Sequence, residues 1–215
     1  MAKKLLVLSD VHYPICRLRT VHEIVKHEHP DNLVMLGDNI ELSRFRNHKK
    51  AYQTFYTKLN DIFPLKESIV MLGDNDYQYA DDKSVAKIIE HFKPINSESN
   101  GLIIFHIGNM NFFHGNLEKS KAIEAIGYEF VKATNRISLN IAPNILAFLV
   151  RKLFGIKGQE YLFLGHLHYL SANGKNIFCG TLNREFMPFP DSLGYVTLMH
   201  DGFRVLPKSI KAVRI

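Results

Sequence analysis

The sequence contains no tryptophan and only two cysteines among its 215 residues. Cys16 and Cys179 lie far apart and neither belongs to a close cysteine pair, which excludes a small disulfide scaffold and favours a reducing compartment. The first apolar run stops at Asp10 and is too short for a signal-peptide core or a membrane span. These absences predict a cytoplasmic protein.

Glycine and proline are also scarce, at 13 and 8 residues, so collagen and low-complexity disorder are excluded. Hydrophobic residues make up 46% of the chain and charged residues 22%, a balance that lets one domain bury a substantial core. The formal charge of +6 is modest, so an anionic partner would be recognised by clustered charge rather than by the total. We expect residues 1–215 to form a single domain, because no linker-like tract or internal repeat divides them.

Short apolar runs alternate with stretches of helical spacing in the first half of the chain. Residues 5–8, 33–36 and 69–72 have the pattern of buried strands, and residues 45–62 and 85–92 that of helices. This alternation predicts an α/β layered fold. Hairpin signals then follow in the second half, at Gly108-Asn109 and Asp201-Gly202, which predicts a mixed sheet or two sheets packed face to face.

The segment from about 118 to 156 differs from the rest because it has no strand pattern. Its apolar residues are spaced as on one face of a helix, which predicts a helical insertion. Pro143 is expected to divide this insertion into two helices. The insertion also carries basic residues, so it could either pack on the sheet or cap a binding site.

Three carboxylates stand where predicted strands meet solvent. Asp10, Asp38 and Asp74 each follow a buried apolar run, and the carboxyl ends of strands in open α/β sheets form the crevice where ligands bind. A single Gly-Asp after a strand is an ordinary turn. Three in succession at equivalent positions predict a shared site.

The second half supplies imidazoles in the same positions. One histidine follows an apolar run in His-Gly, and two more follow another run in Gly-His-x-His, whose rings can reach one crevice and bind divalent transition metals. Together with the three carboxylates and the histidine of Asp-x-His after the first run, they make seven ligands, about what two metal ions sharing a carboxylate need. The ordered set is Asp10, His12, Asp38, Asp74, His114, His166 and His168.

The series Asp-x-His, Gly-Asp, Gly-Asp-Asn-Asp, His-Gly and Gly-His-x-His, from Asp10 to His168, resembles the signature of the calcineurin-like metallophosphoesterase superfamily. The resemblance implies a four-layer α-β-β-α sandwich of the metallo-dependent phosphatase type, with two divalent metal ions at the sheet edge. Manganese is favoured, and iron, zinc, nickel and magnesium also suit these ligands. The implied ligands are Asp10, His12, Asp38 and His168 for one ion, and the bridging Asp38 with Asp74, His114 and His166 for the other.

The third motif departs from the family pattern, which usually reads Gly-Asn-His followed by Asp or Glu. Asp74 puts a carboxylate where the family has an amide ligand, which should bind the second ion more strongly. Asn75 stands where the family has a histidine that contacts the substrate or protonates the leaving group. Asparagine can hydrogen-bond but cannot act as a general acid at neutral pH. Asp76 is expected to support the third loop by hydrogen bonding.

The resemblance implies hydrolysis of a phosphodiester or pyrophosphate bond, in preference to a monoester, by a hydroxide that bridges two metal ions. Asp38 and Asn75 are the candidate catalytic residues. Arg44 and Arg46 follow the second motif closely and, with Arg184 and Asn75, are the candidate contacts to an anionic substrate.

Several substrates remain open. The insertion resembles, more weakly, the cap of UDP-2,3-diacylglucosamine hydrolases, which would imply a nucleotide or lipid-linked diphosphate and peripheral membrane contact. The pI near 9.2 allows a nucleic-acid nuclease, but little chain follows His168 to form a DNA-binding cap. A non-catalytic metal-binding scaffold is disfavoured because every ligand position holds a coordinating side chain. The substrate, the native metals and the oligomeric state are not determined by the sequence.

Overall fold

The computed structural model of this chain describes residues 1–64, 68–77, 97–99, 102–115, 141–172, 174–185, 192–202 and 204–215. The helix expected at 85–92 lies outside these residues. No helix among the described residues has both the length and the apolar character that crossing a bilayer requires.

The first sheet is mixed and has the strand order β11-β10-β1-β2-β3. The neighbours β1, β2 and β3 are parallel, and β10 runs antiparallel to both β1 and β11. The apolar runs predicted at 5–8, 33–36 and 69–72 therefore form three adjacent parallel strands of this sheet, with the last of them at its edge. Its strands are β1 (Lys3–Leu8), β2 (Asn32–Met35), β3 (Ser68–Val70), β10 (Gly194–His200) and β11 (Lys211–Arg214).

The second sheet is also mixed, with the order β4-β5-β6-β7-β9-β8. The predicted turn at Gly108 and Asn109 joins the antiparallel hairpin of β5 and β6. The strands β6, β7 and β9 are parallel, so their carboxyl ends share one edge of the sheet. The strands are β4 (Ser97–Ser99), β5 (Leu102–Ile107), β6 (Met110–Phe113), β7 (Tyr161–Leu164), β8 (Leu170–Ser171) and β9 (Asn176–Cys179).

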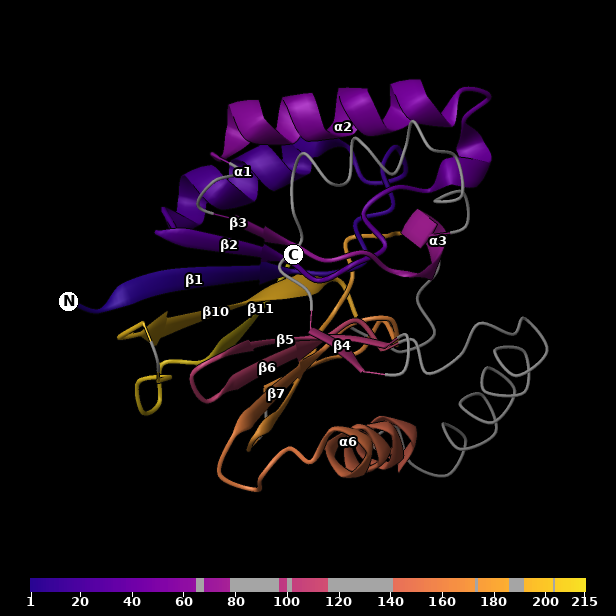
Figure 1. Ribbon diagram of the computed structural model, residues 1–215. Helices are drawn as coiled ribbons and strands as arrows, with labels where there is room; N and C mark the ends of the chain where they lie inside the picture. Colours follow the sequence, from indigo (N-terminus) through magenta and orange to yellow (C-terminus); the bar gives the residue numbers. More distant parts are fainter. Residues whose placement is uncertain are drawn as a thin grey trace.

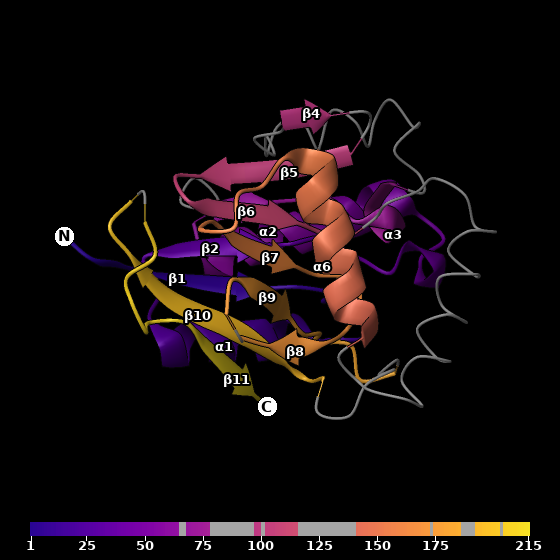
Figure 2. The same ribbon diagram turned by 90° about the horizontal axis from the view of Figure 1, so that it is seen from below.

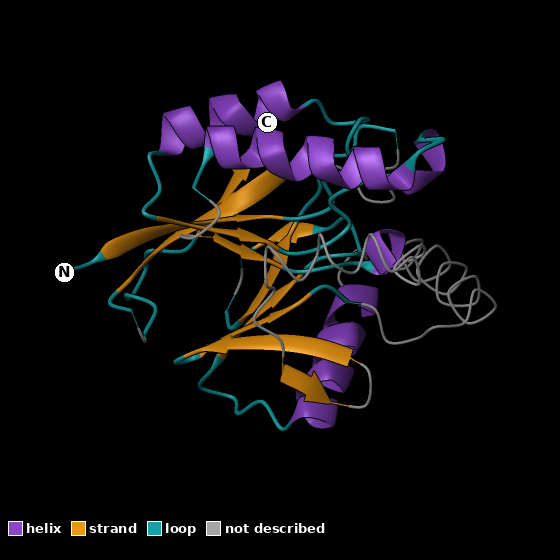
Figure 3. Cartoon of the chain, turned by 45° about the horizontal axis from the view of Figure 1, so that its top comes forward, coloured by secondary structure: helices purple, strands orange, loops and turns teal. Residues whose placement is uncertain are grey.

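Helices cover the outer faces of the two sheets, as Figures 1 and 3 show. On the first sheet lie α1 (Leu18–Glu28) and α2 (His48–Ile62), with a short 3-10 turn, η1 (Leu42–Arg44), between them. The start of α2 is capped by Asn47, whose side chain accepts a hydrogen bond from the Lys50 amide at 2.9 Å.

Three apolar clusters separate the layers. Along β1, Leu6 and Leu8 pack with α1 and α2, whereas Leu5 and Val7 face the second sheet, as the twofold alternation of a strand requires. Along β6 the side chains alternate in the same way. Phe112 belongs to the core between the sheets, and Phe113 packs under the helix at 141–154. The expected α-β-β-α sandwich is therefore confirmed.

The described part of the insertion is α6 (Ile141–Phe154), which lies on the outer face of the second sheet (Figure 2). Pro143 lies in the first turn of α6, and the helix expected before it falls outside the described residues, so the division there stays a prediction. Proline is tolerated there because amides in a first helical turn have no intrahelical acceptor. Ala147 and Val150 are buried against the sheet, whereas Phe148 and Leu153 are about half exposed, at 58% and 49%. Contact of this segment with a lipid or a membrane stays a prediction.

Arg151 ties α6 to the second sheet. Its guanidinium donates to Asn176 Oδ1 at 2.7 Å and to the carbonyls of Lys157, Glu160 and Lys175 at 2.8 to 3.0 Å. This basic residue of the insertion thus has a structural role.

Replacing Arg151 by methionine is expected to lower the free energy of unfolding by about 2 kcal/mol, because several acceptors lose their donor while the apolar stem is kept. Urea unfolding measures the change. Arg19→Met on α1 is the control, since that side chain is 86% exposed. Equal midpoints for the two variants would contradict the prediction.

Candidate metal centre

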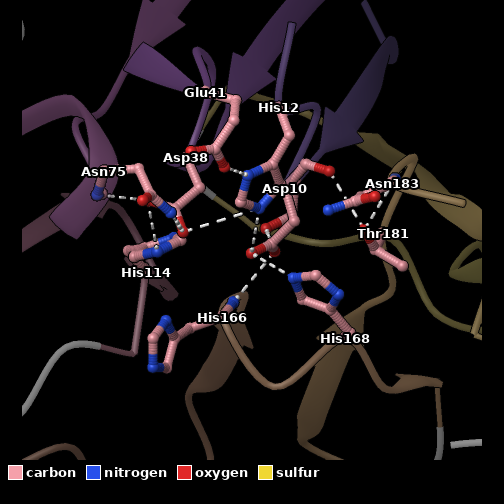
Figure 4. Close-up of polar contacts among 12 residues, drawn as sticks. Asp10, His12, Asp38, Glu41, Asn75, His114, His166, His168, Thr181 and Asn183 are labelled. Atoms are coloured by element: carbon pink, nitrogen blue, oxygen red, sulfur yellow. Dashed lines mark hydrogen bonds and ion pairs between the residues drawn. The ribbon is translucent and has the colours of Figure 1, made fainter. Parts of the chain in front are cut away.

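The candidate ligands gather where the two sheets present the carboxyl ends of their parallel strands. Asp10 follows β1 and Asp38 follows β2, while His114 follows β6 in the facing sheet. His166 and His168 follow β7, the parallel neighbour of β6. Figure 4 shows the side chains from the two sheets meeting at this edge. The sequence motifs lie far apart along the chain, and the strand topology brings them together.

Six of the seven predicted ligands form two groups, and within each group the ligand atoms lie within 4.8 Å of one another. In the first group, His168 Nε2 lies 3.2 Å from Asp10 Oδ1. In the second, His114 Nε2 lies 3.4 Å from Asp38 Oδ1. The groups are Asp10, His12 and His168, and Asp38, His114 and His166.

Asp38 connects the two groups. One carboxylate oxygen, Oδ1, faces His114, and the other, Oδ2, lies 3.7 Å from His12 Nε2 of the first group. Asn75 also donates to both oxygens. Its backbone nitrogen lies 3.1 Å from Oδ1, and its side-chain Nδ2 lies 3.0 Å from Oδ2. The carboxylate is therefore held with one oxygen toward each group.

Unusual backbone torsions concentrate at this edge. Among the described residues, seven residues other than glycine have positive φ, and five of them are candidate ligands. Such torsions cost about 1 kcal/mol or more each and persist only where the surroundings enforce them, which is typical of functional sites. The five are Asp10, His12, Asp38, His166 and His168, with φ between 48° and 61°.

Hydrogen bonds between loops enforce these torsions. The amide of His12 donates to the Asp38 carbonyl at 2.8 Å, joining the first loop to the second. On the other side, Thr181 Oγ1 and the Leu182 amide both donate to the Asp10 carbonyl, at 3.0 and 3.2 Å. The loops after β1 and β2 are thus fixed to one another, and the loop after β1 is fixed to the segment after β9.

Two histidines are oriented by acceptors on their Nδ1 atoms. His114 Nδ1 lies 3.0 Å from the Leu36 carbonyl, and His12 Nδ1 lies 3.0 Å from Glu41 Oε2. A carbonyl or carboxylate oxygen can only accept, so Nδ1 carries the hydrogen in both rings. Each ring therefore turns its Nε2 toward the carboxylates.

The electrostatics reflect this packing of acids against imidazoles. Burial alone would raise the pKa of Asp10, but His168 above all, with His114 and His12, holds that pKa well below its usual range. Burial would lower the pKa of His12, but the hydrogen bond to Glu41 and the nearby carboxylates raise it to about 8. Both pKa shifts favour the charged forms, so the carboxylate of Asp10 and the imidazole of His12 stabilise each other as ions.

Asp76 supports two of the loops. The buried carboxylate accepts hydrogen bonds from the amides of Asn39, Ile40 and Gly73 at 3.0 Å, and from Asn39 Nδ2 at 3.1 Å. Burial and the negative charge of Asp38 raise the pKa of Asp76 to about 7, while the amide donors act in the opposite direction. The support expected for the third loop thus extends to the second.

The other predicted residues stand as follows. Asp74 begins the short helix α3 (Asp74–Tyr77), and its side chain lies outside the described part of the structure. Arg44 forms an ion pair with Glu185 at 2.7 Å. Arg46 and Arg184 are exposed. Contacts of these arginines to a substrate stay predictions.

Two contributors were not anticipated from the sequence, Glu41 and Thr181. Glu41 follows Asp38 by three residues, so proximity in the chain offered a signal. Thr181 contacts the backbone of a residue that precedes it by 171 positions, and no sequence pattern marks it.

No protein-family model matches this sequence, and no curated protein does either. Among solved structures, the phosphoesterase YfcE from E. coli shares 16% identity over 99% of each chain, with a TM-score of 0.46. A metallophosphoesterase from Sphaerobacter thermophilus shares 14% identity over 100% of this chain and 89% of its own, with a TM-score of 0.47. A third structure shares 13% identity over 100% of this chain and 99% of its own. Its TM-score of 0.52 indicates that the two chains have a similar fold.

Proposed function

We propose that this protein is a metal-dependent phosphoesterase that hydrolyses a phosphodiester or pyrophosphate bond. The observation that carries the proposal is Asp38, whose two carboxylate oxygens face two adjacent groups of imidazole and carboxylate donors. That arrangement suits two cations that share one carboxylate. The order of the motifs, which resembles the calcineurin-like superfamily, supports the same function.

The residues at this edge fit divalent metal ions. His12 Nε2 is buried and has no hydrogen-bond partner among the described residues, although it points at two carboxylates. A buried imidazole nitrogen in that position needs either a proton or a cation. Manganese is the metal we favour, and mixed carboxylate and imidazole donors also suit iron, zinc, nickel and magnesium. The first ion would be held by Asp10, His12, Asp38 and His168, and the second by Asp38, Asp74, His114 and His166.

Bound divalent cations supply an activated water and neutralise charge on the phosphoryl oxygens. The contribution of the chain is to hold the donors in place and to orient the ester. Asn75 can donate a hydrogen bond to a phosphoryl oxygen but cannot protonate a leaving group. We therefore favour substrates whose leaving group departs as a stable anion, such as a nucleotide or lipid-linked diphosphate, with Arg44, Arg46 and Arg184 as candidate contacts.

The test measures hydrolysis of bis(p-nitrophenyl) phosphate by the EDTA-stripped protein, before and after Mn(II) is restored. Turnover that depends on Mn(II) is expected, and faster turnover than with p-nitrophenyl phosphate would support a diester preference. Two bound ions without hydrolysis of any diester or pyrophosphate would support the scaffold instead. A protein that binds no divalent ion would overturn the proposed centre.

A further inference from the structure

Glu41 lies next to the centre although no motif includes it. It follows Asp38 on the loop after β2, and its Oε2 is 3.0 Å from His12 Nδ1. The other carboxylate oxygen accepts a hydrogen bond from Ser43 Oγ, and the backbone amide of Glu41 donates to the Tyr13 carbonyl at 2.9 Å. Both carboxylate oxygens and the backbone of Glu41 are therefore fixed.

The contact determines which nitrogen of His12 faces the carboxylates. An ionised carboxylate can only accept, so the hydrogen between the two side chains belongs to Nδ1. The remaining nitrogen, Nε2, points toward Asp38 Oδ2 at 3.7 Å and Asp10 Oδ1 at 4.0 Å. A carboxylate behind an imidazole also makes its ligating nitrogen more basic.

The corresponding Nδ1 contact of the second group involves a neutral acceptor. His114 donates from Nδ1 to a neutral backbone carbonyl, that of Leu36. Among the imidazoles whose Nδ1 contacts are described, His12 alone has a carboxylate behind it. His12 is therefore supported by a negative charge, whereas the described support of His114 is neutral.

We infer that Glu41 is a positioning residue that orients His12 and strengthens metal binding at the position held by Asp10, His12 and His168. The inference rests on the proposed function, because it presupposes a metal pair. Loss of such a carboxylate behind a ligating histidine weakens metal binding by about 10- to 100-fold.

The experiment is calorimetric titration of the EDTA-stripped protein with Mn(II), for wild type, Glu41→Ala and Glu41→Gln. Alanine should raise the Kd of one of the two ions by about 10- to 100-fold and leave the Kd of the other nearly unchanged. Glutamine keeps an acceptor for Nδ1–H without the charge, so its Kd should be intermediate. Glu185→Ala is the control, because Glu185 is 55% exposed and pairs with Arg44 at 2.7 Å.

A spectroscopic measurement separates orientation from general stability. In the Zn(II)-loaded protein labelled with 15N-histidine, the Nδ1–H of His12 should exchange slowly with water in the wild type and rapidly in Glu41→Ala. Wild-type affinity and slow exchange in both Glu41 variants would overturn the inference while leaving the proposed function intact. If the alanine variant does not fold, Glu41→Gln decides alone, and an unchanged Kd overturns the inference. A wild-type protein without bound metal would instead refute the proposed function.

Discussion

Alanine in place of Asp38 is expected to remove bound metal and lower kcat/KM on a phosphodiester by at least about 1000-fold. The carboxylate faces both donor groups, at 3.4 Å from His114 Nε2 and 3.7 Å from His12 Nε2, so its loss affects both ions together. Removal of Asp10 should be less damaging, because it belongs to one group.

The measurement combines metal analysis of the purified variant with Mn(II)-dependent hydrolysis of bis(p-nitrophenyl) phosphate. Asp61→Ala, an exposed carboxylate on α2, is the matched control and should keep both properties. Asp38→Asn preserves the shape but not the charge, and we expect it to behave like the alanine variant because a neutral amide bridges two cations poorly. Wild-type metal content and turnover in Asp38→Ala would refute the assignment of Asp38 as the shared ligand.

The sequence predicted that these residues gather at one edge, because their positions depend on the topology of the strands. Apolar runs such as those ending near Asp10 and Asp38 are short and buried on both faces, which is typical of parallel strands. Parallel neighbours end at one edge, so polar residues after successive runs must lie close together. His114 and the histidines after β7 follow the same rule in the second sheet.

The sequence could not predict how the side chains at that edge are oriented. The contact between Glu41 and His12 depends on the torsions of two loops, and His12 itself has a φ of 48°. The substrate contact predicted for Arg44 stays a prediction, and its ion pair with Glu185, which lies 141 positions away, had no signal in the sequence. Local sequence patterns carry no information about such pairs, because the tertiary fold brings their partners together.

The close packing of the loops also explains why the motifs contain glycine. A Cβ atom on Gly73 would lie 2.6 Å from His114 Nε2 and overlap both the backbone nitrogen and the carboxylate of Asp38. Gly37 is equally confined, since a Cβ there would lie 2.5 Å from His114 Nδ1 and 2.9 Å from the Gly73 nitrogen. The His114 ring of the second sheet thus packs directly against the backbone of Gly37 and Gly73 in the loops of the first sheet. A side chain at either glycine would push the two sheets apart at this edge.

Gly73→Ala should therefore be the most disruptive small substitution at the centre. We expect it to lower the free energy of unfolding by about 3 kcal/mol and to abolish tight Mn(II) binding, because the loop and the Asp38 carboxylate must move apart. Urea unfolding and calorimetric titration measure the two effects. Gly158→Ala is the matched control: a Cβ there meets no atom within 4 Å, and neither glycine has positive φ. Its unfolding should change by less than about 1 kcal/mol. If the two variants unfold at the same urea concentration and bind Mn(II) equally, close packing at Gly73 does not hold the centre together.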